Sequence, residues 1–180
     1  MKFIPLSLLV ATMAVACTSC NLNGAHQAVL FNDEVVRVGQ TLTATATVWA
    51  DSLTVYRQTG TYSRLASQRV KMENYLDHHI DDLVKAKPVG IGGAQFKNEA
   101  LNYLRLEKRM ISDGFKEFEQ LSENSSDDER NAVSRKASAF IKEEEQAILA
   151  FKAVQKKYAA DNNFRLETKD LKEQNRSRDH

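Results

Sequence analysis

Apolar residues and one carboxylate recur along residues 133–158 at alternating gaps of three and four, which is the spacing of one face of an α-helix. The stripe consists of Val133, Ala137, Phe140, Glu144, Ala147, Phe151, Val154 and Tyr158. Ser126 and Glu129 precede it with the spacing of a capping box, in which each residue satisfies a backbone N–H group at the helix start. The sequence therefore predicts a long helix that begins just after Ser126 and buries one face.

Two more stretches, residues 63–86 and 96–121, carry the same helical periodicity. Their predicted inward-facing residues are Leu65, Met72, Leu76, Ile80 and Leu83, and then Phe96, Ala100, Tyr103, Leu104, Glu107, Met110, Ile111, Phe115, Phe118 and Leu121. Pro88 and three of the chain's seven glycines lie between the two stretches. Because proline and glycine disfavour helix interiors, residues 87–93 are predicted to form a loop.

Residues 28–56 contain two conflicting patterns. A heptad of mostly apolar positions runs through Ala28, Phe31, Val35, Val38, Leu42, Trp49 and Tyr56. Residues 41–48, however, alternate threonine with apolar residues, which is typical of a β-strand, and threonine's branched side chain also favours strands. We expect a helix, because the heptad continues on both sides and a lone strand would have no partner elsewhere in the chain. Trp49 and Tyr56 would then be anchors of the core.

Four helical stretches joined by short connections predict an all-α fold, an antiparallel up-down-up-down four-helix bundle over residues 27–166. The 180-residue chain has an ordinary globular composition, with 42% hydrophobic and 27% charged residues. Its 25 basic and 24 acidic residues nearly balance, which argues against a nucleic-acid partner. Residues 167–180 are highly charged without apolar spacing, and they are predicted to form a disordered tail.

The N-terminus carries the pattern of a secretory signal peptide. Lys2 is followed by a mostly apolar run over residues 3–16, which is shorter than the roughly 20 residues of a membrane-spanning helix. Ala14, Val15 and Ala16 then precede Cys17, an arrangement that resembles the bacterial lipobox, whose cysteine receives diacylglycerol. We therefore expect a signal peptide over residues 1–16, followed by a lipidated cysteine and a tether over residues 17–26.

Cys20 is the alternative anchor, although a cysteine stands among the residues that precede it. A secreted protein with a Cys17–Cys20 disulfide is a further alternative. Cleavage before Cys17 removes Lys2 and leaves the mature charge balanced, so attachment to a membrane would depend on the acyl chains.

Three segments resemble a family of small, uncharacterised bacterial surface lipoproteins with a helical-bundle body. They are Phe31-Asn32-Asp33-Glu34-Val35-Val36, the Ala100-Leu101-Asn102-Tyr103-Leu104 opening of the segment 96–118, and the closing run from Gln155 through Tyr158 to Phe164. The threonine-rich part of residues 28–56 departs from the charged first helix of that family. The resemblance implies a lipid anchor and a helical body, and it supplies no catalytic residues.

Glu107 and Glu144 each lie on an apolar stripe near the middle of a predicted helix, so antiparallel packing would place them at similar heights. Paired interior carboxylates occur in di-iron bundles, but those sites also use Glu-x-x-His motifs. Met110 and Ala147 stand where those histidines would be. The spacing therefore does not match a di-iron centre.

An isolated buried carboxylate is costly, so we expect these two to form a structural polar layer, with each carboxylate at the bundle edge or paired with a base. The candidate bases are Arg105, Lys108 and Lys142. A ligand or metal site that uses Glu107, Glu144 and His79 is the alternative.

A second cluster, residues 77–82, places His78, Asp81 and Asp82 on one helical face. Zinc needs three or four protein ligands, and two or three from one exposed helix would make only a weak site. We therefore expect a solvated acidic face with His79 half-buried beside it.

The features together predict a lipid-anchored protein of the bacterial cell envelope, at the outer membrane or facing the periplasm, that acts without catalysis by binding or as a structural element. The membrane is its expected partner, through the N-terminal anchor, and an envelope protein is a second candidate. No cofactor is expected. The alternative is a helical bundle that binds a small molecule or metal through its interior carboxylates.

Overall fold

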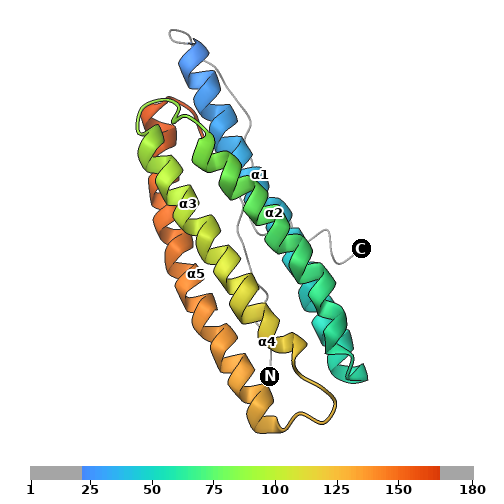
Figure 1. Ribbon diagram of the computed structural model, residues 1–180. Coiled ribbons are helices and arrows are strands. Elements are labelled where there is room, and N and C mark those ends of the chain that lie inside the picture. The colour runs from blue at the N-terminus through green and yellow to red at the C-terminus, as the bar shows by residue number, and fades with distance from the viewer. Residues whose placement is uncertain (1–21, 167–180) are drawn as a thin grey trace, which may run out of the picture.

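The computed structural model describes residues 22–166, which form four long helical segments and no strand within that range. The elements are α1 (Leu22–Thr59), the 3₁₀ turn η1 (Tyr62–Leu65), α2 (Ala66–Lys85), α3 (Gly93–Arg109), the π-helical turn η2 (Met110–Phe115), α4 (Lys116–Glu119) and α5 (Asp127–Asp161). Because α3, η2 and α4 follow one another without a break, they make one helical segment. The segments run antiparallel, with α1 beside α2 and α3 beside α5 (Figure 1). The predicted all-α four-helix bundle is confirmed.

Several predictions concern residues outside this range: the signal peptide over residues 1–16, Cys17, Cys20 and the tail over residues 167–180. The described part of α1 overlaps the segment predicted as a tether. This helix begins at Leu22, whereas the helical domain was expected from residue 27. No proline lies in this segment to stop the helix from extending toward the N-terminus. None of the helices between residues 22 and 166 is long and apolar enough to cross a membrane.

The threonine-rich part of α1 is helical, as the heptad predicted. The hydroxyls of Thr43, Thr45 and Thr47 donate to the carbonyl oxygens four residues earlier, at 2.9, 2.8 and 2.9 Å. These bonds satisfy the hydroxyls within the helix, so the strand preference of threonine is overridden by local bonding and by tertiary packing. The heptad residues Leu42 and Trp49 are buried.

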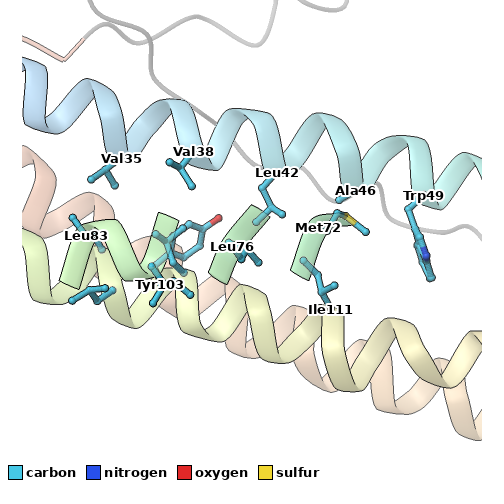
Figure 2. Packing of buried hydrophobic residues seen from close by; sticks show 14 of the residues in the cluster. Val35, Val38, Leu42, Ala46, Trp49, Met72, Leu76, Leu83, Tyr103 and Ile111 are labelled. Atoms are coloured by element: carbon cyan, nitrogen blue, oxygen red, sulfur yellow. The ribbon is translucent and has the colours of Figure 1, made fainter. Parts of the chain in front are cut away.

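The core runs along the whole bundle between the α1–α2 and α3–α5 pairs. Figure 2 shows α1 side chains pointing at residues of α2, α3 and η2; the labelled ones are Val35, Val38, Leu42, Ala46, Trp49, Met72, Leu76, Leu83, Tyr103 and Ile111. Full burial of one such aliphatic side chain contributes about 1.5–3 kcal/mol, so the shared core is the main source of stability. Trp49 is a core anchor as predicted, stacked on Phe115 with ring centroids 4.0 Å apart.

The predicted capping box at the start of α5 is confirmed. Ser126 Oγ accepts a hydrogen bond from the Glu129 backbone N–H at 3.3 Å, and the Glu129 carboxylate accepts one from the Ser126 N–H at 2.7 Å. These bonds lower the pKa of Glu129 and satisfy two N–H groups that the helix cannot bond internally.

Candidate functional site

A pair of glutamates lies in the interior between α3 and α5. Glu107 is 2% exposed and Glu144 is 4% exposed, and their side chains are close enough to share a hydrogen bond. The continuous segment from α3 to α4 runs antiparallel to α5, and each of the two carries its glutamate near mid-length, which brings the carboxyl groups to one height as the sequence predicted. The interior polar layer is therefore present.

The sequence predicted that each of these carboxylates would lie at the bundle edge or pair with a base, and this prediction was wrong. Neither carboxyl group is at the bundle edge, and neither forms a salt bridge with a base in residues 22–166. Lys108 instead pairs with Asp77 of α2, and Arg105 is exposed on the outer side of α3. The helical phase that buries Glu107 turns its basic neighbours away from it, so the pKa of Glu107 is set by its burial, by Glu144 and by Tyr103.

This arrangement favours protonation of the pair. Burial raises the pKa of Glu107 well above its usual value, and the neighbouring charge of Glu144 raises it further. Burial also raises the pKa of Glu144, while the hydrogen bond from Glu107 opposes that rise. Two adjacent carboxylates cannot both ionise cheaply in a low-dielectric interior, so burial and the charge of Glu144 favour the protonated form of Glu107.

Tyr103 lies one turn before Glu107 on the same face of α3, and its ring is in the core (Figure 2). Its hydroxyl faces Glu107 and favours the ionised carboxylate, but neither this hydroxyl nor Glu107 Oε1 completes a hydrogen bond of normal geometry. Burial also raises the pKa of Tyr103, so the hydroxyl stays protonated. The site thus contains buried polar atoms that are only partly satisfied.

The π-helical turn η2 begins three residues after Glu107, where the sequence predicted an uninterrupted helix. A π turn adds one residue to a turn of the helix, so it changes the direction in which all later side chains of that helix point. Gly114 within η2 lies against the Phe140 ring of α5, where a Cβ atom would stand 3.1 Å from a ring carbon. The only signal in the sequence is Gly114 itself, a small residue inside an otherwise helical pattern.

The histidine cluster is separate from the carboxyl pair. His79 is half-buried as expected, with its ring 4.4 Å from that of Tyr75 and Nδ1 3.9 Å from a Glu34 carboxylate oxygen of α1. Burial lowers the pKa of His79. His78 and Asp82 form an exposed pair at 3.2 Å, and Asp81 is also exposed. Within residues 22–166, no group of three or more His, Cys, Asp or Glu side chains is arranged to hold a metal ion.

A second buried polar cluster was not predicted. Gln155 of α5 donates to Asn32 Oδ1 of α1 at 2.9 Å, and both side chains are buried. The Tyr158 hydroxyl donates to the Val89 carbonyl at 2.7 Å, and burial raises its pKa to about 12. The segments around Asn32 and Gln155 are two of those that resemble the lipoprotein family, and here they meet at one end of the bundle.

The loop between α2 and α3 is also held by Asn162, the residue that directly follows α5. Asn162 accepts from the Ile91 N–H at 2.9 Å and donates to the Ile91 carbonyl at 2.8 Å. Gly90 reaches a φ of +72°, and its missing Cβ leaves room for the Asn162 amide and for Ala28 of α1. The bonds join α1, the loop and the end of α5 into one structural unit.

Comparison with models of known protein families, with curated protein sequences and with solved structures gives no match for this chain. The lipoprotein resemblance accordingly stays a prediction from the quoted segments.

The chemistry available to the carboxyl pair follows from its burial. Glu107, Glu144 and Tyr103 are each at most 5% exposed, so a substrate from solvent does not reach them without separation of α3 and α5. The pair can store a proton within the core, and its energy therefore depends on pH.

Proposed function

We propose that this protein is a lipid-anchored component of the bacterial cell envelope whose helical body acts by binding or as a structural element, without catalysis. The observation that carries this proposal is the position of the cationic end of the bundle. α1 begins at Leu22, directly after the candidate anchors Cys17 and Cys20 in the sequence, and the end of the bundle at this helix start is rich in lysine.

The segments 22–30, 84–98 and 153–166 meet at this end, as the bonds of Tyr158 to Val89 and to Ala28 indicate (Figure 1). They carry one acidic residue, Asp161, and six basic residues: Lys85, Lys87, Lys97, Lys156, Lys157 and Arg165. The opposite end, built from segments 52–66 and 116–130, carries four basic and six acidic residues. The chain is nearly neutral overall, but the end of the bundle next to Leu22 is cationic and the opposite end is acidic.

Charge of this sign suits a membrane surface with anionic lipids, where each lysine or arginine contributes about 1 kcal/mol of attraction. Ile91, at the tip of the loop of the same end, is 67% exposed and offers an apolar contact. Acyl chains on an N-terminal cysteine would supply most of the attachment, and the cationic end would orient the body against the bilayer.

Mass spectrometry of the membrane fraction from a bacterium that processes lipoprotein precursors tests the anchor. Trypsin should release an acylated peptide from Cys17 to Arg37, and Cys17→Ala should abolish it. An acylated peptide that starts at Cys20 would move the anchor to that residue. A mature N-terminus without acyl groups, in a protein recovered from the soluble fraction, would refute the proposal.

A further inference from the structure

A groove on the outer side of the α3–α5 pair is lined by cationic, amide and apolar side chains. Neither the buried carboxyl pair nor the proposed lipid anchor gives these side chains a role. The groove has a volume of about 720 Å³. It is lined by Asn102, Arg105, Leu106 and Arg109 of α3 and by Lys142, Glu143 and Gln146 of α5. On each helix these residues fall within a few residues of one another, and the two helices lie side by side (Figure 1).

The groove has a surplus of positive charge. Arg109 is paired with Glu143 and lies over the Phe140 ring, 5.8 Å from its centroid, which fixes the position of its guanidinium group. Arg105 and Lys142 form no salt bridge with any residue of the range 22–166. Two cations from neighbouring helices therefore line one groove without a salt bridge of their own, and a bound anion would give both a partner of opposite charge.

We propose that this groove binds a small organic oxyanion, a molecule with carboxylate or phosphate groups. The Arg105 guanidinium offers parallel N–H donors that match either group, and Lys142 adds a point charge from the opposite wall. Asn102 and Gln146 also line the groove and carry amide donors, and Leu106 gives it an apolar surface for the carbon skeleton of the ligand.

The proposal is independent of the anchor, because the groove lies at mid-length on the bundle, away from the cationic end next to Leu22. Failure of acylation at Cys17 would leave the groove unchanged, and failure of anion binding would leave the anchor unchanged.

Isothermal titration calorimetry of the purified full-length protein at physiological ionic strength tests the proposal, with citrate as the carboxylate probe and inorganic pyrophosphate as the phosphate probe. We expect saturable binding of at least one probe with one site per chain, and the stronger probe assigns the chemical class. The double variant Arg105→Gln/Lys142→Gln should weaken binding about tenfold or more, since charged hydrogen bonds are lost.

Lys71→Gln/Lys156→Gln is the matched control, because it removes two exposed cations that lie outside the groove. It should change the affinity less than twofold. Circular dichroism should show that both double variants keep the helical content of the parent. The proposal is overturned if neither probe binds saturably at millimolar concentration, or if the two double variants lose affinity equally.

Discussion

The carboxyl pair between α3 and α5 makes the stability of the fold depend on pH, and Glu107→Gln tests this directly. Glutamine has nearly the same shape as glutamate and carries a permanent N–H donor toward Glu144. The variant therefore offers Glu144 a donor that does not titrate, and it removes the titration of Glu107 itself.

The direction of the effect follows from proton linkage. Burial raises the pKa of Glu107 in the folded protein, whereas the unfolded chain titrates near 4.5. Above pH 4.5 the folded state therefore holds more protons than the unfolded state, and the stability of the parent falls as pH rises until the folded pKa is passed. Each retained proton changes the free energy of unfolding by about 1.4 kcal/mol per pH unit.

Glu107→Gln lacks this titration, so its stability relative to the parent should rise by up to about 1.4 kcal/mol per pH unit, from pH 4.5 until the pH passes the folded pKa of Glu107. Urea unfolding at several pH values, followed by circular dichroism, measures the difference, and titrations common to both proteins cancel in it. Glu145→Gln, an exposed neighbour of Glu144, serves as the control and should give a pH profile parallel to that of the parent. Parallel profiles for Glu107→Gln and the parent would refute the buried proton.

Three further predictions concern stability and are measured by urea unfolding. Ser126→Ala removes the capping box of α5 and should cost about 1 kcal/mol; an unchanged midpoint would contradict the role of the cap. Gly90→Ala should destabilise the fold, because φ is +72° and the new methyl group meets Asn162, whereas Gly24→Ala in α1 meets no atom within 4 Å and should gain up to about 1 kcal/mol. The reverse order would show that the loop relaxes. Trp49→Ala opens a cavity beside Phe115 and should cost about 3–5 kcal/mol, and a loss below 1 kcal/mol would exclude Trp49 as a core anchor.

The sequence predicted the helical segments well, because their periodicity is long and local signals mark their ends. The capping box at Ser126 and the loop around Pro88 depend on residues only a few positions away in the sequence, so the sequence alone predicts them. The threonine-rich part of α1 was ambiguous locally, and the longer heptad identified it correctly. The π turn after Glu107 escaped prediction; it contains Gly114, which lies against the Phe140 ring of α5.

The candidate site also has features that the sequence predicted and features that only the tertiary structure decided. The spacing of apolar residues by itself put Glu107 and Glu144 on the inner faces of their helices, since helical phase is a property of the chain. Their mutual pairing, and the exposure of Arg105 on the other side of α3, depend on the relative rotation of two packed helices, which no local pattern encodes. The bond between Asn32 and Gln155 joins residues 123 positions apart, and only the tertiary structure could bring these two amides together. Periodicity thus determined which faces are buried, and packing decided which polar groups meet inside.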